Sequence, residues 1–359
     1  MVAARWQQGR PRLRRRDCTR ARNSIGGWSA CCRFLLLFTL LLGSFSASAT
    51  AAEPLQRLLF IISKETSIYR QIVAAGESTL AEGGELLVWV AADGNARELR
   101  KRVADFAPTL VVTVGTAAAE LTYQALLADD YRSVSPPLLS TLLTRSAFEV
   151  FSRRYIDAGQ SATPVVVQLL DQPLERQLQL AELVVPSAQT IGVMVGPATL
   201  LPVSQFDLWS EQFAARVEPV YLSATDNPIR RLEPALAQSD VFVPLADSRQ
   251  FNLATSRWIL QLSYRYQRPI IGYSASYVEA GAVAAVYTSA EDVATELAQI
   301  LQRWSVEGLP TASAQMAPEQ FSISLNPAAA VALDIPLADV DFYRSELRKM
   351  IAGGDSELD

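Results

Sequence analysis

Short apolar runs of strand length alternate with amphipathic stretches of helix length along most of this 359-residue chain. The runs are apolar from end to end, which is typical of parallel strands whose sheet is covered by helices on both faces. The helical stretch at 95–106 places Leu99, Val103 and Phe106 on one face. The strands predicted in this first series are Leu58–Ile62, Glu85–Ala91, Leu110–Val114 and Pro137–Leu143. The pattern therefore predicts an α/β protein.

A second series of the same kind follows the small and polar segment Asp157–Thr163, which we interpret as the first passage between two lobes. Its predicted strands are Val165–Leu170, Thr190–Val195, Pro219–Leu222, Val241–Pro244 and Val283–Tyr287. One helix is predicted from Phe206, Trp209, Phe213 and Val217, and Ser289–Asp292 has the form of a capping box before another. We expect two Rossmann-like lobes with parallel sheets, at 55–160 plus about 288–316 and at 161–287 plus about 317–350.

The N-terminal segment differs from the rest of the chain. Its first 33 residues contain nine arginines against the single acid Asp17, and the apolar run Phe34–Leu42 and several small residues follow. This order predicts a secretory signal at 1–51, cleaved after Ala49 or Ala51, and a periplasmic protein. An uncleaved anchor is the alternative, although the strongly apolar part is short for a bilayer.

Removal of this segment would change the composition of the protein. Cys18, Cys31 and Cys32 all precede the expected cleavage site, so the mature chain would have no thiol and no disulfide. It would carry 23 basic and 36 acidic residues, a net charge of −13. Such a surface disfavours nucleic acid and anionic membranes as partners.

Few residues of the chain are suited to catalysis. The sequence has no histidine, no cysteine after the predicted signal, and no nucleophile-elbow, P-loop or Ser-x-x-Lys motif. The carboxylate pair Asp129-Asp130 is interpreted as an exposed helix end. We therefore expect a protein that is not an enzyme and that holds no cofactor and no metal.

Several segments together resemble a known family. They are Val112–Ala118, Gln172–Arg176, Ile191–Gly196, Ala280–Ala282, Phe321–Asn326 and Leu333–Pro336. In their order and spacing the chain resembles the substrate-binding proteins of ABC transporters with the type I periplasmic binding fold, in the group with tryptophan- and tyrosine-binding members. The resemblance implies two lobes that close on one small ligand, a monomer, and an ABC permease as partner.

Two loops depart from the family pattern. Thr144-Arg145-Ser146 stands where members usually have an Asp-Pro loop, and Asp157–Gln160 stands where they have a Pro-Gly-Gly-Asn-x-Thr-Gly loop. Because both loops would face the ligand, the resemblance does not imply which ligand this chain binds.

The candidate binding residues of the first lobe follow its predicted strands. At Gly115-Thr116-Ala117 a β-branched run ends and a helix begins, which leaves backbone N–H groups for a carboxylate or amide oxygen. The alternative is a tight turn that binds nothing. Ser63 and Lys64 follow the first strand, and Thr144 and Arg145 follow the fourth. Arg145 would pair with an anionic ligand or bridge the lobes.

The candidates of the second lobe occupy the matching edge. Asp247 with Ser248 could accept a ligand ammonium group, or Asp247 could cap the next helix. Tyr273 with Ser274 lies at a neighbouring strand end, where Tyr273 and Tyr277 could stack on a flat ligand or pack in the core. The helical tryptophans Trp209, Trp258 and Trp304 are assigned to packing.

These observations favour an exported solute-binding protein that captures a small organic ligand in an interlobe cleft, for example an amino-acid-like solute, and that delivers it to an ABC importer. An orphan periplasmic sensor, which presents its ligand state to a membrane receptor or kinase, is the alternative.

Overall fold

The computed structural model describes residues 57–128, 135–156, 163–197, 199, 201–223, 225–246 and 253–355. The chain divides into the units Met1–Ala51 and Ala52–Asp359, and every described residue belongs to the second. The predicted signal, Asp129-Asp130, Asp157–Gln160, Asp247 and Ser248 lie outside the described residues.

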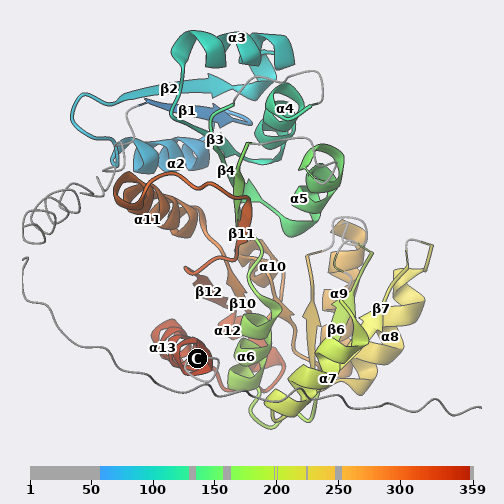
Figure 1. Ribbon diagram of the computed structural model, residues 1–359. Coiled ribbons are helices and arrows are strands. Elements are labelled where there is room, and N and C mark those ends of the chain that lie inside the picture. The colour runs from blue at the N-terminus through green and yellow to red at the C-terminus, as the bar shows by residue number, and fades with distance from the viewer. Residues whose placement is uncertain are drawn as a thin grey trace, which may run out of the picture. The chain divides into compact units, whose positions relative to one another are not determined.

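The first sheet has six parallel strands in the order β11-β5-β4-β3-β1-β2 (Figure 1). The strands are β1 (Arg57–Ile62), β2 (Glu85–Val90), β3 (Leu110–Val114), β4 (Leu138–Leu143), β5 (Val165–Leu169) and β11 (Ala314–Met316). The helical segments are α2 (Ser67–Glu77), η1 (Ala91–Asp93), α3 (Ala96–Phe106), α4 (Thr116–Leu126), α5 (Arg145–Phe151), the π-helical η2 (Ser152–Ile156) and α11 (Ala290–Glu307).

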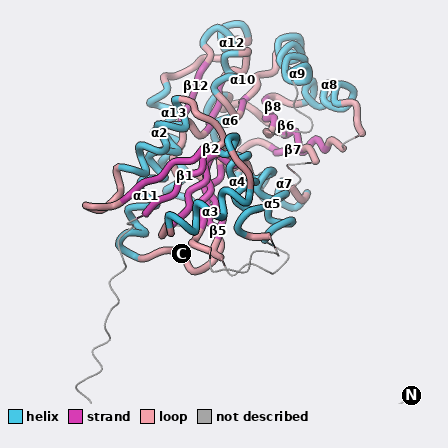
Figure 2. The backbone as a smooth tube through the Cα atoms, turned by 90° about the horizontal axis from the view of Figure 1, so that it is seen from above, coloured by secondary structure: helices cyan, strands magenta, loops and turns pink. Residues whose placement is uncertain are grey.

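Helices cover both faces of this sheet, as Figure 2 shows. Leu59 and Ile61 of β1 pack in a core with α3, α4 and α5, whereas Leu58, Phe60 and Ile62 pack with α2 and α11. Because successive side chains of a strand point to opposite faces, a strand buried on both faces has to be apolar throughout. This confirms the expectation of a parallel sheet covered on both faces.

The second sheet consists of two three-stranded parts, β7-β6-β8 and β12-β10-β9, which an isolated bridge between Phe242 and Ile270 connects. Only β12 among these strands is antiparallel to its partner. The strands are β6 (Thr190–Val195), β7 (Arg216–Tyr221), β8 (Val241–Pro244), β9 (Ile271–Gly272), β10 (Ala284–Tyr287) and β12 (Ser322–Leu325). The helices are α6 (Leu174–Val184), α7 (Val203–Gln212), α8 (Pro228–Gln238), α9 (Leu253–Tyr266), α10 (Ala275–Glu279), α12 (Pro327–Ala332) and α13 (Val340–Asp355).

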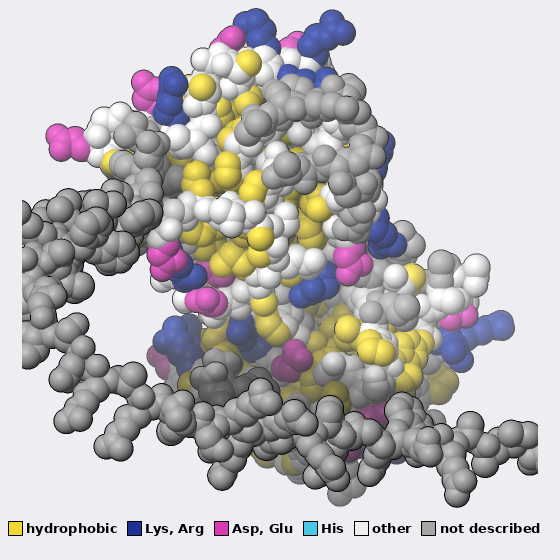
Figure 3. Space-filling model, viewed as in Figure 1, with side chains coloured by type: hydrophobic (Ala, Val, Ile, Leu, Met, Phe, Trp, Pro, Cys, Tyr) yellow, Lys and Arg dark blue, Asp and Glu magenta, His cyan; other side chains and the backbone are white. Residues whose placement is uncertain are grey.

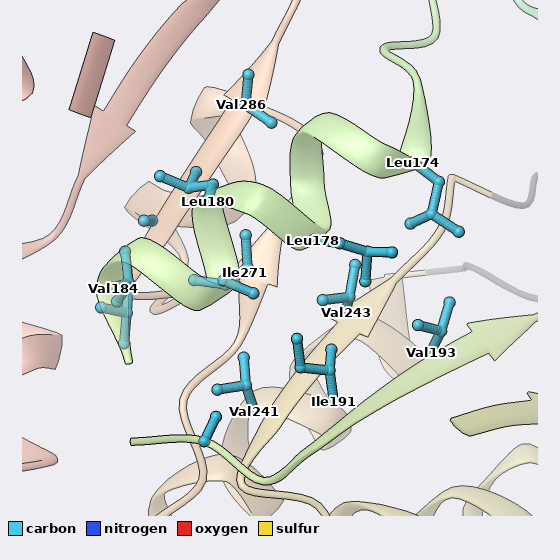
Figure 4. Close-up of a cluster of buried hydrophobic side chains, with 14 of the residues drawn as sticks. Leu174, Leu178, Leu180, Val184, Ile191, Val193, Val241, Val243, Ile271 and Val286 are labelled. Atoms are coloured by element: carbon cyan, nitrogen blue, oxygen red, sulfur yellow. The ribbon is translucent and has the colours of Figure 1, made fainter. Parts of the chain in front are cut away.

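This second sheet also has an apolar core on each face. One core joins it to α6, α7, α12 and α13, and the other joins it to α8, α9 and α10. Figure 4 shows part of the first of these cores, where Leu178 of α6 lies near Ile191 of β6 and Val243 of β8. Trp209 belongs to this core and is 3% exposed, as expected for a packing residue.

The chain passes between the two sheets after β5, after β10 and after β11. The structure thus confirms the predicted α/β architecture of two sheets joined by several crossings. Among the described residues, no helix is both long and apolar enough to span a membrane.

Two elements differ from the predictions. The strand predicted at Val165–Leu170 is expected to begin the second series, but β5 (Val165–Leu169) pairs with β4 and belongs to the first sheet. The helix predicted to include Val217 ends at Gln212, and Val217 lies in β7, which begins at Arg216 rather than Pro219. Val217 is a buried position of β7 that lies four residues after Phe213. This spacing is the same as on one face of a helix, so it predicted a helix where the chain forms a strand.

The capping box predicted at Ser289–Asp292 is confirmed. Oγ of Ser289 accepts a hydrogen bond from N of Asp292 at 3.1 Å, and Oδ2 of Asp292 accepts one from N of Ser289 at 2.8 Å. The same Oδ2 accepts a hydrogen bond from Oγ of Ser322 at the start of β12, at 2.7 Å. The first turn of α11 is therefore tied to a strand of the second sheet.

Replacement of Ser289 by Ala is expected to lower the free energy of unfolding by about 1 to 2 kcal/mol, because it leaves N-terminal N–H groups of α11 without a cap. Ser305→Ala, near the other end of α11, removes only a local bond to Gln302 O and should change this free energy by less than about 0.5 kcal/mol. Urea denaturation of both variants tests the difference, and equal losses would contradict it.

Candidate functional site

The carboxyl edge of the first sheet brings together the residues predicted in the first lobe. N of Ser63, after β1, donates to Val114 O at 3.0 Å, and N of Gly115, after β3, donates to Thr141 O of β4 at 2.9 Å. The ends of β1, β3 and β4 are therefore neighbours. The predicted residues that follow them are Ser63, Lys64, Gly115, Thr116, Ala117, Thr144 and Arg145.

Gly115 forms the turn between β3 and α4, and its backbone requires glycine. Its φ is 89° and its ψ is 165°, a region that side-chain-bearing residues essentially do not adopt. A Cβ at this position would lie 2.7 Å from Oγ of Ser63 and 2.7 Å from Oη of Tyr69. The turn is thus closely packed against the end of β1 and against α2.

Ser63 supports the start of α4. Its Oγ accepts a hydrogen bond from N of Ala118 at 2.9 Å and donates one to Val114 O at 3.1 Å. This hydroxyl is therefore used within the protein. No described residue accepts a hydrogen bond from the N–H of Thr116 or Ala117, and both residues are exposed. These two N–H groups stand at the positive end of the α4 dipole.

Thr144 and Arg145 begin α5. Oγ1 of Thr144 accepts a hydrogen bond from N of Ala147 at 3.3 Å, and N of Arg145 donates to Oδ2 of Asp171 at 2.5 Å. The Arg145 guanidinium donates to Oε1 of Gln315 in β11 at 3.3 Å. The pKa of the Asp171 carboxyl is raised because the group is buried. The hydrogen bond from the backbone of Arg145 lowers this pKa but has the smaller effect.

The backbone just before Thr144 is irregular. Leu142 has a φ of 53°, and the pairing of β4 with β5 shifts register between Ser140 and Leu143. Irregularities of this kind near strand ends redirect the side chains that follow.

In the second lobe the structure describes Tyr273 and Ser274. The rings of Tyr273 and Tyr277 are stacked, with centroids 5.4 Å apart and an interplanar angle of 18°. Tyr277 is buried in the core, which confirms the packing interpretation for it, whereas Tyr273 is half-buried. Burial raises the pKa of Tyr273. Oγ of Ser274 accepts a hydrogen bond from N of Tyr277 at 3.2 Å and so caps α10.

Hydrogen bonds of Ser63 and Gly115 connect the predicted residues of the first lobe, and the cap of α10 connects Ser274 to Tyr277 in the second. Gln315, the described partner of the Arg145 guanidinium, lies in β11 of the same first sheet, so the expected bridge between the lobes stays a prediction.

The crossings themselves contain a polar network that the sequence analysis missed. Nε2 of Gln172, just after β5, donates to Oγ1 of Thr288 at 2.7 Å and to Gln320 O at 2.9 Å. Oγ1 of Thr288 in turn donates to Leu170 O at 2.7 Å. Gln172 therefore links all three crossing segments.

Arg176 of α6 extends this network into the interior. Its NH1 group donates to Oε1 of Gln172 and to Pro318 O, the latter at 3.0 Å, and its guanidinium lies 4.9 Å from the ring centre of Phe321. Arg176 is 6% exposed. A cation so deeply buried needs several polar partners to offset its lost hydration.

Glu296 of α11 is a buried carboxylate of this region. It is 2% exposed, and its Oε2 accepts a hydrogen bond from N of Glu319 at 3.2 Å. Burial raises the pKa of its carboxyl group. Gln172 and Arg176 lie within a segment that carried the family resemblance, but nothing in the pattern indicates that Arg176 or Glu296 is buried.

The described residues contain no group of three or more His, Cys, Asp or Glu side chains that could hold a metal ion. The edge of the first sheet offers the backbone N–H groups of Thr116 and Ala117 and exposed cations, which suit the binding of an anionic or hydrogen-bond-accepting group.

Replacement of Gly115 by Ala is expected to lower the free energy of unfolding by about 1 to 3 kcal/mol, since it adds backbone strain and a clash with Ser63 and Tyr69. Gly83→Ala is the matched control, because Gly83 also has a positive φ of 82° but a Cβ there meets nothing within 4 Å. Denaturant unfolding should show a larger loss for Gly115→Ala, and an equal loss would contradict the close packing.

The pKa of Glu296 predicts a pH effect. Because burial raises the folded-state pKa above the ordinary value of 4.5, the folded state binds more protons between these two values. The free energy of unfolding of the wild type should then fall, relative to Glu296→Gln, as the pH rises from about 4.5, and the difference should level off above the folded-state pKa. Urea denaturation at a series of pH values tests this. A difference that does not change with pH would contradict it.

No family model matches the sequence, and no curated protein matches it. Among solved structures, the ligand-free, open form of a substrate-binding protein with adhesive properties from Clostridium difficile is similar, with a TM-score of 0.55 and 16% identity over 79% of this chain and 96% of that chain.

Two further similar structures have lower TM-scores. A domain in complex with L-Trp from Streptococcus pneumonia has a TM-score of 0.47 and 15% identity over 81% of this chain and 98% of that one. A transcriptional activator of the comK gene from Bacillus halodurans has a TM-score of 0.47 and 12% identity over 83% and 96%.

At these identities the likeness concerns the fold. The strand order, the three crossings and the similarity to the clostridial substrate-binding protein agree, and the described chain has the two-lobed α/β fold of the type I periplasmic binding proteins.

Proposed function

We propose that this chain is an exported solute-binding protein that captures a small organic ligand between its lobes and delivers it to an ABC importer. The observation that carries the proposal is the start of α4. In the fold of a substrate-binding protein, it offers two exposed N–H groups at the carboxyl edge of a parallel sheet. Ligands of open α/β sheets bind outside the carboxyl ends of the strands.

The three segments that connect the sheets are consistent with lobes that move relative to each other. The chain connects the sheets by three segments, and all three meet at Gln172. Such connections permit hinge closure around a ligand, in which a few residues at the ends of elements absorb the change. Tyr273, which rests on the buried ring of Tyr277, is the aromatic surface that we assign to the second lobe's side of the ligand.

Export is part of the proposal because of the basic segment and the apolar run Phe34–Leu42 at the N-terminus. Fractionation of expressing cells followed by N-terminal sequencing tests it. A new N-terminus near residue 50 or 52 in the periplasmic fraction supports export, and an intact N-terminus in the cytoplasm contradicts it.

A thermal-shift screen of the purified protein against amino acids, nucleosides, sugars and small carboxylates tests ligand binding. A true ligand at 100 times its dissociation constant should stabilise the folded protein by about 2.7 kcal/mol. Thr116→Val removes a hydroxyl at the start of α4 and should weaken binding by about 1 to 3 kcal/mol. Thr295→Val, an exposed position within α11, is the matched control and should leave binding unchanged. The absence of any stabilising compound would contradict the proposed function.

A further inference from the structure

The peptide group between Pro318 and Glu319, in the crossing from β11 to β12, is bound by a buried charge at each end. Its carbonyl oxygen, Pro318 O, accepts a hydrogen bond from the NH1 group of Arg176 at 3.0 Å. Its N–H group, that of Glu319, donates to Oε2 of Glu296 at 3.2 Å. The C=O and N–H of a trans peptide group point in opposite directions, so the cation and the carboxylate lie on opposite sides of it. Each charge faces the end of the peptide dipole that has the opposite sign.

The two charged side chains come from different lobes. Arg176 lies in α6, whose Leu178 packs in a core of the second sheet. Glu296 lies in α11, whose Leu297 packs in a core of the first sheet. A single peptide group of the crossing segment therefore contacts a helix of each lobe.

The residues that follow this peptide group are also held by side chains. N of Gln320 lies 3.5 Å from the same Oε2 of Glu296, and Gln320 O accepts a hydrogen bond from Nε2 of Gln172 at 2.9 Å. The ring of Phe321, the next residue, lies 4.9 Å from the Arg176 guanidinium. Because its backbone groups have these partners, the segment 318–320 has little freedom to bend by itself.

Charged side chains are otherwise found at the surface, where Figure 3 shows acidic and basic groups. Among the described residues, the buried charged side chains are Arg176 and Glu296. Buried opposite charges usually pair with each other, but no ion pair joins these two described residues. Both bind the intervening peptide group instead. Since this arrangement leaves Nε of Arg176 and Oε1 of Glu296 without a described hydrogen-bond partner, a gain in stability does not account for it.

We propose that the Pro318–Glu319 peptide group is the pivot about which the two lobes turn, and that Arg176 and Glu296 are positioning residues that hold one lobe each to it. This inference rests on the lobe movement of the proposed function and names the residues that guide it. Both side chains are long, so their torsions can change while their charged ends stay on the peptide group. The lobes can then rotate without sliding past each other, and each closure brings the same edges of the two sheets together.

The test measures the spread of distances between the lobes in the ligand-free protein by double electron–electron resonance. Spin labels are attached at Ala104→Cys on α3 and Arg230→Cys on α8, two exposed positions on different lobes. Cys18, Cys31 and Cys32 are replaced by Ser, so the two introduced cysteines are the only thiols of the chain.

Variants of the two positioning residues should loosen the pivot. Glu296→Gln keeps an oxygen that can accept the N–H of Glu319 but removes the charge, and Arg176→Gln removes the cation. Each should widen the distance distribution about twofold, because one lobe is held less firmly to the pivot. Arg176→Lys keeps a positive charge and a donor for Pro318 O, and it should widen the distribution less than Arg176→Gln. Glu307→Gln, an exposed position at the other end of α11, is the matched control and should leave the width unchanged.

A merely structural role predicts a different result. It predicts a lower melting temperature for Glu296→Gln and Arg176→Lys with no change in the width of the distance distribution. Circular dichroism and thermal unfolding show which variants are folded. Glu296→Gln replaces a side chain by one of almost the same shape, so it keeps the test available if Arg176→Gln does not fold.

Hydrogen exchange of the unmodified protein adds a test that needs no variant. A pivot stays closed while the lobes move, so the N–H groups of Glu319 and Gln320 should exchange slowly. We expect rates at least about 10-fold below that of Glu82, which lies in the exposed turn before β2. Exchange of Glu319 as fast as that of Glu82 would overturn the pivot.

These measurements use no ligand, so they separate this inference from the proposed function. Unchanged widths in folded Glu296→Gln and Arg176→Lys variants overturn the pivot but preserve a solute-binding protein. Failure of the whole screen of solutes overturns the proposed function, whereas widened distributions in these variants would still support the pivot.

Discussion

The buried hydrogen bonds of Gln172 hold together the only part of the described structure through which the two sheets are covalently connected. Each sheet has its own apolar cores, so burial of apolar surface stabilises each lobe but does not fix how the chain passes between them. Hydrogen bonds are directional, so those of Gln172 can fix the path of the crossing segments, which burial of apolar surface does not fix.

Charged groups in this region carry an energetic cost. Arg176 and Glu296 are both buried, and Nε of Arg176 and Oε1 of Glu296 have no hydrogen-bond partner among the described residues. Each such atom costs about 1 to 3 kcal/mol relative to a satisfied one. Apolar side chains would avoid this cost, but they could not donate a hydrogen bond to the carbonyl oxygen of Pro318 as Arg176 does. The crossing is thus specified by polar contacts at the expense of stability.

The sequence predicted the positions of strands and helices better than it predicted which strands pair with each other. Apolar runs located most strands, because a strand buried on both faces must be apolar, and the capping box of α11 was visible since its residues are adjacent. The run at Val165–Leu169 looks the same whichever sheet it joins, because strand pairing depends on residues far away in the chain. In the candidate site, Gly115 was recognised from its place between a strand and a helix. The use of the Ser63 hydroxyl by α4 depends on a contact across 55 residues, which no local pattern encodes.

The carboxylate of Asp292 belongs at once to the cap of α11, which packs on the first sheet, and to the start of β12, in the second. Groups that share one acceptor do not contribute independently, because removal of one donor changes the environment of the other. The stabilisation of this helix terminus and the stabilisation of this strand end are therefore coupled and do not add independently. Part of the local order of α11, which packs on the first sheet, thus depends on a strand of the second sheet.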